Sequence, residues 1–162
     1  MFKLAILTIS DAGSKGERLD TSGDVISDYM SEKEFVLIER SILPDEVPKI
    51  SEKLIQWSDE GNIDLILTTG GTGLGPRDVT PEATRAVIDF EVSGITEAMR
   101  IQTLSETNFA MLSRAVAGVR NGCLIINFPG SPTGVTQTIK IVADVIPHAL
   151  EMIRGWRTHK NP

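Results

Sequence analysis

The stretch Thr68-Thr-Gly-Gly-Thr-Gly-Leu-Gly-Pro-Arg-Asp-Val-Thr-Pro-Glu-Ala-Thr84 is the most informative part of this chain. It begins where the apolar run from Asp64 stops, and it contains Thr80-Pro81-Glu82, a strong signal for the start of a helix. The stretch therefore predicts a buried strand, a glycine loop (residues 70–80) and a helix. Small side chains let a ligand approach backbone N–H groups closely, and a helix N-terminus behind them suits a phosphate. The glycine loop is therefore a candidate phosphate-binding site.

Strands and helices alternate on both sides of the glycine loop. Apolar, β-branched runs predict five strands: Lys3–Ile9, Phe35–Leu43, Asp64–Thr69, Ala115–Val119 and Cys123–Phe128. Helical spacing predicts helices from Thr21 or Ser22 to Met30, from Pro44 to Gly61, over Pro81–Asp89, from Gly94 to Glu106, and over Val135–Ile153 with a kink at Pro147. This alternation predicts an α/β domain with a mostly parallel sheet. Asn121-Gly122 between the last two strands predicts one antiparallel hairpin, so the sheet is expected to be mixed.

The length and composition of the chain limit which functions and partners are expected. The chain has 162 residues, which favours one domain, expected over residues 1–157 with a polar tail at 158–162. The net charge of −6 argues against a nucleic-acid partner, which would need a basic face. No run reaches about 18 apolar residues, so no membrane partner is expected and the predicted location is cytoplasmic. The single cysteine, Cys123, lies in an apolar run and is interpreted as a buried structural thiol.

Several polar segments are expected to meet at one edge of the sheet, because ligands in such folds bind at the carboxyl ends of the strands. Three loops leave strand ends: Ser10–Gly23, Gly70–Thr80 and Asn127–Thr133. The helix start at Asp45 follows a fourth strand. In the third loop, Asn127-Phe-Pro-Gly-Ser-Pro132 puts a polar residue and a rigid turn after an apolar strand, a pattern that suits ligand enclosure.

The glycine loop matches neither a P-loop nor a GxGxxG fingerprint. A carboxylate such as Asp78 beside phosphate-binding amides is repulsive unless a cation intervenes. Magnesium, held by one or two carboxylates plus substrate phosphates, is the usual solution. Structural alternatives stay open at this point: Asp78 as a cap near Thr80, Arg77 as a solvated charge, Asp45 as a helix N-cap, Asp20–Gly23 as a cap, and Thr80-Pro81-Glu82 as only the first turn of a helix.

Covalent catalysis has little support, because neither His148 nor His159 lies near these loops in the sequence. Phosphoryl or nucleotidyl transfer needs mainly positioning, a metal ion and charge stabilisation from the protein. Glycines, hydroxyl groups, one arginine and carboxylates suit that chemistry.

Three motifs together carry a family resemblance. The chain resembles the MogA/MoaB family of molybdenum-cofactor biosynthesis in the order and spacing of three motifs, Thr69–Gly73, Arg77–Ala83 and Asn127–Pro132. The segments that fit the same pattern are Ser10-Asp11, Asp20–Gly23 and Pro44-Asp45-Glu46. Arg114-Ala-Val-Ala-Gly118 resembles the compact MoaB-type branch. The resemblance covers almost the whole chain.

The resemblance implies a three-layer α/β/α fold and a homotrimer, with a hexamer as the variant. It implies a molybdopterin adenylyltransferase that uses ATP, molybdopterin and magnesium to make adenylylated molybdopterin and pyrophosphate. A separate molybdenum-insertion enzyme would be the downstream partner. A non-catalytic protein of the same family that binds or delivers molybdopterin is the alternative, and an unrelated nucleotide-binding protein is a third interpretation.

The family's two functional aspartates fall on Asp78 and Asp45, which the resemblance implies are catalytic and hold magnesium. The remaining expected ligand contacts lie in the same loops and are Ser10, Asp11, Asp20, Ser22, Gly23, Thr69, Gly70, Gly71, Thr72, Gly73, Arg77, Thr80, Pro81, Glu82, Asn127, Pro129, Gly130 and Ser131.

Overall fold

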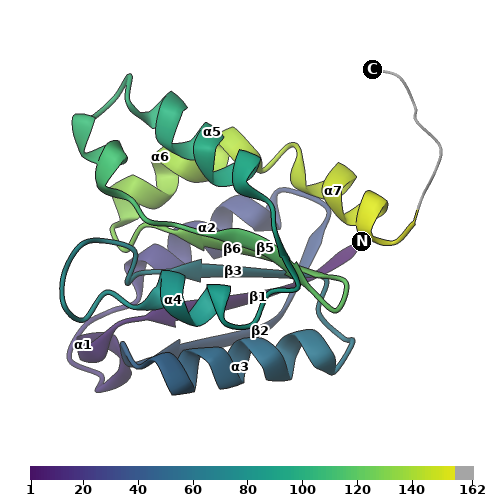
Figure 1. Cartoon of the computed structure of the whole chain (residues 1–162), viewed down its shortest axis with the longest axis horizontal. Helices are drawn as coiled ribbons and strands as arrows, with labels where there is room; N and C mark the ends of the chain where they lie inside the picture. The colour runs from purple at the N-terminus through teal and green to yellow at the C-terminus, as the bar shows by residue number, and fades with distance from the viewer. Residues whose placement is uncertain (156–162) are drawn as a thin grey trace.

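A six-stranded sheet in the order β2-β1-β3-β6-β5-β4 runs through the middle of the molecule, and Figure 1 labels all of these strands except β4. The computed structural model describes residues 1–155, so the predicted tail at 158–162 and the predicted domain end at 157 lie outside the described residues. The parallel strands are β1 (Phe2–Ile9), β2 (Phe35–Leu43), β3 (Leu65–Thr69) and β6 (Cys123–Phe128). β5 (Ala117–Arg120) runs antiparallel to both β6 and the short edge strand β4 (Phe90–Glu91). The predicted mixed sheet is confirmed.

Helices cover both faces of the sheet, so the three-layer α/β/α arrangement is confirmed (Figure 1). Successive strand residues point to opposite faces. In β3, Leu65 and Leu67 therefore enter one core and Ile66 enters the other. The first core packs against α2 (Thr21–Ser31), α5 (Ser93–Thr103), α6 (Pro132–Val142) and α7 (Ile146–Ile153). The second packs against α3 (Val47–Asp59) and α4 (Thr80–Arg85).

The hairpin between β5 and β6 has the backbone that its sequence predicts. Asn121 and Gly122 have φ values of +45° and +80°, as a type I′ turn requires at both central residues. The turn lies at the amino end of β6, opposite the edge where β1, β3 and β6 end.

The predicted last helix, Val135–Ile153, is wrong in one respect. α6 ends at Val142, and a separate helix, α7, begins at Ile146. Pro147 lies in the first turn of α7, where its missing N–H removes no helical hydrogen bond. The proline therefore starts a new helix instead of kinking a continuous one.

Other boundaries differ by a few residues. α4 ends at Arg85, earlier than predicted, and α5 ends at Thr103. The sequence pattern missed β4, the four-residue helix α1 (Asp11–Ser14) and the 3-10 helix η1 (Asn108–Leu112). All three are too short to show a hydrophobic period.

Candidate active site

The glycine loop turns sharply where β3 ends, and its first two glycines have left-handed backbones. φ is +101° at Gly70 and +67° at Gly71. A Cβ on Gly70 would lie 2.2 Å from a carbonyl oxygen at the end of β1, so only glycine fits there. The N–H of Gly70 donates to the last residue of β6 at 3.2 Å and, contrary to the prediction, is not available for a phosphate. Within residues 1–155 the amides of Gly71, Thr72 and Gly73 donate to no protein acceptor.

Two aspartates from different loops come together beside Gly71. Asp45 follows β2 and Asp78 lies in the glycine loop, and both line one cavity. A Cβ on Gly71 would lie 3.1 Å from Asp45 Oδ1, so the missing side chain lets this carboxylate approach the loop. Burial raises the pKa of Asp45, and the nearby negative charges of Asp11 and Asp78 act in the same direction. Asp45 is therefore held at a site that disfavours its charge, and a bound cation would relieve this.

Asp11 connects Asp45 to the glycine loop. The Asp11 N–H donates to Asp45 Oδ2, and the Asp45 N–H donates to Asp11 Oδ1, both at 3.0 Å. Arg77 donates to both Asp11 carboxylate oxygens, at 3.0 and 2.9 Å. Hydrogen bonding from Arg77 lowers the pKa of Asp11. Arg77 is exposed but is not only a solvated charge, because it joins the glycine loop to Asp11, and Asp11 in turn is bonded to Asp45.

The capping alternatives are wrong for both aspartates. The N-cap of α3 is Glu46, not Asp45. Asp78 Oδ2 accepts the Gly75 N–H at 2.8 Å and so closes a turn inside the glycine loop, away from the helix. Helix α4 begins at Thr80, after Val79, so Thr80 lies inside the first turn and does not cap it. The buried hydroxyl of Thr80 instead donates to the Gly70 carbonyl at 2.8 Å, which pins the start of the loop to the helix.

Asn127 was predicted to contact a ligand, but its side chain is buried and fully hydrogen-bonded. Its oxygen accepts the Val116 N–H at 3.1 Å. Its amide nitrogen donates to the hydroxyls of Thr68 and Thr84 at 2.9 and 3.1 Å. The side chain therefore joins three elements below the site, and its correct role is structural.

The other predicted site residues lie at the same edge of the sheet, where several organise the loops. Asp20 caps α2 through Gly23 N–H, and it also accepts from Thr8 Oγ1 and from Arg40. The cap interpretation is thus confirmed for Asp20, not for Thr21 or Ser22. Three further hydroxyl groups bind backbone: Ser10 caps α1, Ser131 caps α6, and Thr69 donates to the Pro129 carbonyl. Ser22 and Pro81 are buried in the first turns of α2 and α4.

Arg114 is a site residue to which the sequence reasoning assigned no role. It comes just before β5 and donates to the carbonyls of Gly73 and Asp78, both at 2.8 Å. It also pairs with Glu82 and lowers the pKa of that carboxyl. No local pattern marks such a residue, because the contact depends on β5 running antiparallel to its neighbours.

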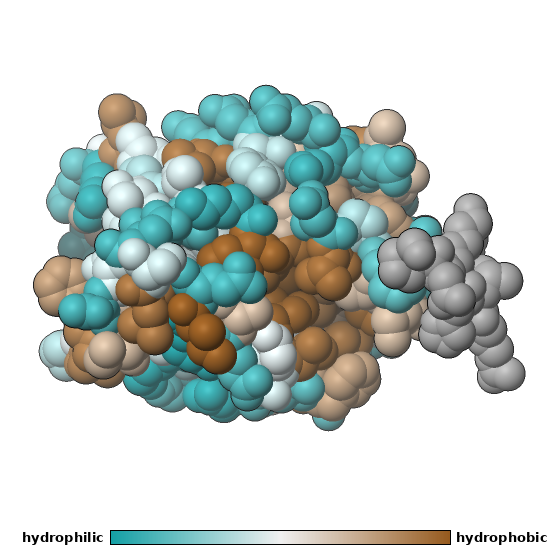
Figure 2. Space-filling model, turned by 90° about the horizontal axis from the view of Figure 1, so that it is seen from above, coloured by the Kyte–Doolittle hydropathy of each residue, from teal (hydrophilic) through white to brown (hydrophobic). Residues whose placement is uncertain are grey.

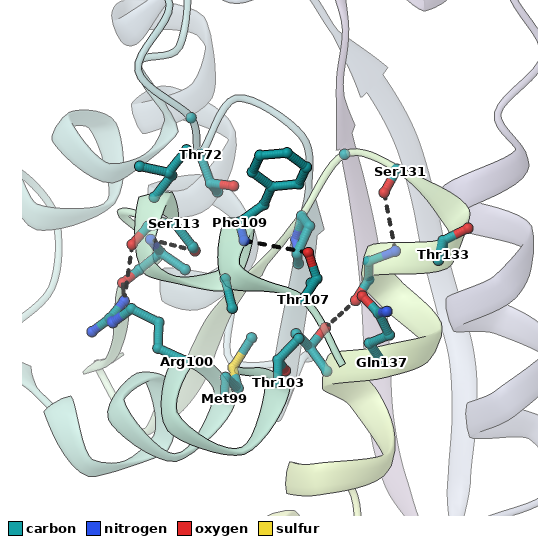
Figure 3. Close-up of a pocket in the computed structure, with 18 of the residues that line it drawn as sticks. Thr72, Met99, Arg100, Thr103, Thr107, Phe109, Ser113, Ser131, Thr133 and Gln137 are labelled. Atoms are coloured by element: carbon teal, nitrogen blue, oxygen red, sulfur yellow. Dashed lines mark hydrogen bonds between the residues drawn. The ribbon is translucent and has the colours of Figure 1, made fainter. Parts of the chain in front are cut away.

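Two cavities meet at this edge. The large cavity, about 560 Å³, has an apolar side made by Met99, Phe109 and Leu112. Figure 3 shows its polar side chains, which include Arg100, Thr103 and Gln137. The small cavity, about 290 Å³, is more polar and contains Asp20, Asp45 and Ser10. The residues that line both are Gly71, Asp78, Gly130 and Ser131.

The large cavity draws on elements that the sequence analysis did not associate with the site. Its apolar side comes from α5 and η1, and Gln137 comes from α6. Met99 and Gln137 belong to the amphipathic helices α5 and α6, whose sequence spacing indicates only core packing, and η1 is too short to show a pattern.

Fold and site together define a small-molecule-binding α/β protein that has room for two ligands beside a pair of aspartates. Within residues 1–155 no helix has the length and apolar character to cross a membrane. Residues 5–148 match the family described as a probable molybdopterin binding domain, and the chain belongs to that family.

Individual relatives resemble the chain over nearly its full length. A molybdopterin adenylyltransferase from Helicobacter pylori is 40% identical over 154 residues, which cover 94% of this chain and 88% of the relative. The crystal structure of MoaB from Thermus thermophilus, a molybdopterin biosynthesis enzyme, is 48% identical with a TM-score of 0.91, covering 96% of this chain and 98% of that one. The tungsten cofactor synthesizing protein MoaB from Pyrococcus furiosus is 31% identical with a TM-score of 0.86, covering 95% and 98%.

Proposed function

We propose that this protein is a molybdopterin adenylyltransferase of molybdenum-cofactor biosynthesis. A phosphate oxygen of molybdopterin would attack the α-phosphorus of ATP, and the bond from that phosphorus to the oxygen bridging to the β-phosphate would break. The products would be adenylylated molybdopterin and pyrophosphate. Relatives that carry this enzyme name match nearly the whole chain, as in Helicobacter pylori and Escherichia coli at 40% and 34% identity.

The observation that carries the proposal is the shared wall between the two cavities. One substrate in each cavity would bring the reacting phosphates to Gly71, Asp78, Gly130 and Ser131. The amides of Gly71, Thr72 and Gly73 donate to no protein acceptor within residues 1–155 and could bind phosphate oxygens there. Holding two reactants in line is the main catalytic contribution that phosphoryl-type transfer needs from a protein.

The carboxylates at and beside the shared wall suit a magnesium ion whose remaining ligands come from the substrates. Within the described part of the chain there is no cluster of three or more acidic, histidine or cysteine side chains that could hold a metal alone. Asp45 and Asp78 supply two carboxylates beside the proposed phosphate position, the donor set that Mg²⁺ takes together with phosphates. Bound magnesium would offset negative charge on the departing pyrophosphate. Asp45 and Asp78 would hold it, and the Asp11–Arg77 pair would keep Asp45 oriented.

The test is an assay with purified protein, molybdopterin, ATP and magnesium chloride, in which adenylylated molybdopterin and pyrophosphate are measured. We expect both products from the wild type. Asp78→Asn should lower turnover by about 10²–10³-fold, as removal of a transition-state stabilising group does. Asp144→Asn is the matched control, because Asp144 is exposed and lines neither cavity.

Two outcomes would contradict the proposed function, and a third would contradict only the role of Asp78. Tight molybdopterin binding without product would favour the binding or delivery protein. Nucleotide binding without molybdopterin affinity would favour an unrelated pathway. Equal turnover in Asp78→Asn and Asp144→Asn would leave the enzyme but remove Asp78 from its catalytic role.

The proposal includes a cytoplasmic homotrimer that passes its product to a molybdenum-insertion enzyme, as the family resemblance implies. Exposed apolar side chains support self-association, and Figure 2 shows hydrophobic residues gathered on the face that carries α5 and α6. On α5 and η1, Ile101, Phe109 and Met111 are 68%, 79% and 62% exposed. Light scattering that gave a monomer at micromolar concentration would rule out the trimer.

A further inference from the structure

Arg114 closes the glycine loop from outside the two cavities. Its backbone N–H donates to the Thr72 carbonyl at 2.9 Å. Its guanidinium donates to the carbonyls of Gly73 and Asp78 at 2.8 Å each and to the Glu82 carboxylate. One side chain thus joins both ends of the segment between residues 73 and 78 to the first turn of α4.

The bridged segment has few other anchors. Leu74 is 67% exposed, and residues 75–77 are exposed as well. Apart from the Arg77 pair with Asp11, its recorded bonds are the two between Gly75 and Asp78. These bonds shape the turn but do not attach it to the sheet. Two links therefore place the turn, and Asp78 with it, relative to Asp45: the Arg77 pair with Asp11 on one side and the carbonyl bonds of Arg114 on the other.

The same bonds orient backbone amides. In a trans peptide the C=O and the following N–H point in opposite directions. With the Thr72 carbonyl held by the Arg114 N–H, the N–H of Gly73 is directed away from Arg114. Arg114 itself lines neither cavity, whereas Thr72, Gly73 and Asp78 line the large one. Arg114 therefore acts on the site only through the loop that it holds.

A second arginine fixes the segment that carries Arg114. Arg100, on α5, donates to the carbonyls of Ser113 and Ala115 at 3.4 and 3.2 Å, one on each side of Arg114 (Figure 3). It also donates to Thr96 Oγ1 at 3.3 Å. Two arginines in series thus connect helix α5 to the glycine loop.

We propose that Arg114 is a positioning residue for adenylyl transfer, which keeps the glycine loop closed so that Asp78 and the amides of residues 71–73 meet the reacting phosphates. This rests on the proposed function for its effect on turnover. Its structural part, the ordering of the loop, stands independently. A lysine keeps the charge but cannot reach two carbonyls and a carboxylate at once, because it lacks the planar fork of donors.

The chain offers a matched control in Arg120. This arginine also makes three guanidinium bonds, two to Asp59 and one to the Val87 carbonyl at 2.8 Å. It lies beside the hairpin turn, at the edge of the sheet opposite the site. Arg114→Lys and Arg120→Lys therefore each remove a fork of three bonds, one just before β5 and the other at the last residue of β5.

The experiment compares both variants in turnover and in amide hydrogen exchange over residues 71–79. We expect Arg114→Lys to lower kcat by about 100-fold, the scale of a small misplacement of reacting groups, and to speed exchange in this segment. Arg120→Lys should keep the wild-type kcat and exchange. Guanidinium ion added to Arg114→Ala should restore part of the turnover, which a general loss of stability would not allow.

Two results would overturn the positioning role. One is turnover of Arg114→Lys within about twofold of wild type, or within twofold of Arg120→Lys. The other is unchanged exchange over residues 71–79 in the Arg114 variants. If the wild type itself makes no product, the proposed function fails, and the exchange measurement still decides whether Arg114 orders the loop.

Discussion

Replacing Asn127 by leucine should lower the free energy of unfolding by about 4 kcal/mol, because the buried amide makes three hydrogen bonds that leucine cannot replace. Loss of its oxygen leaves the buried Val116 N–H without a partner, which costs about 1–3 kcal/mol. The two bonds to Thr68 and Thr84 contribute about 1 kcal/mol each. Leucine has the same branching as asparagine and is somewhat larger, so no cavity forms and the lost hydrogen bonds dominate the change.

Urea unfolding followed by circular dichroism, at one fixed protein concentration, measures this change. In a separate thermal unfolding experiment, the midpoint temperature of Asn127→Leu should be about 10 °C below that of the wild type, given a chain of this size. Asn108→Leu is the control, since Asn108 is exposed at the start of η1 and its loss should matter by less than about 0.5 kcal/mol.

The opposite result would refute the structural role of Asn127. If the amide mainly contacted a ligand, Asn127→Leu would unfold like Asn108→Leu and would show its defect only as a raised KM. A loss below about 1 kcal/mol with that kinetic signature would return Asn127 to the ligand contacts.

Three further predictions concern single residues. Burial raises the pKa of Asp45, so the protonated carboxyl stabilises the fold below the ordinary pKa of an aspartate, and this stabilisation is lost as the pH rises through the raised pKa. Asp45→Asn removes the buried negative charge, so it should raise the midpoint of urea unfolding at pH 7 and change it little at pH 3. A lower midpoint at pH 7 would contradict this. Gly71 and Gly61 have nearly the same positive φ, +67° and +68°, but only at Gly71 would a Cβ lie 2.3 Å from Thr80 Oγ1. Calorimetry should show that Gly61→Ala lowers the free energy of unfolding by about 1 kcal/mol and that Gly71→Ala lowers it clearly more. Equal losses would rule out the clash. Burial raises the pKa of Cys123 to about 12, so Ellman's reagent should react with this thiol only in urea, and fast reaction in the native protein would disprove its burial.

Much of the fold was predictable from local pattern. The predicted strand Cys123–Phe128 matches β6, because a continuous apolar run between turn residues has few other uses, and Phe35–Leu43 matches β2, which has apolar and β-branched residues at both ends. Asn121-Gly122 predicted the hairpin for a backbone reason, since few other pairs accept two positive φ values. The break between α6 and α7 was missed because Val142 and Ile146 keep the apolar spacing across it.

The site was predictable in its loops and less so in the roles of its side chains. Parallel strand ends bring the loops of Asp45 and Asp78 to one cavity, as the topology rule requires. Whether a polar side chain faces a ligand or the core depends on its neighbours in space, and Asn127 faces the core. Arg114 was missed for a related reason. It comes before β5, and a residue before a strand lies at the ligand edge of the sheet only if that strand runs antiparallel to its neighbours, as β5 does.

The reversed direction of β5 also makes the molecule easy to couple to a surface. The turn at Asn121 and Gly122 stands about one strand length, roughly 20 Å, from the carboxyl ends of the sheet. A short insertion there that carries one cysteine would supply a reactive thiol, because the native Cys123 is buried. Protein immobilised through that thiol would be oriented with both cavities toward the solution, so that a sensor surface could report substrate binding without blocking it.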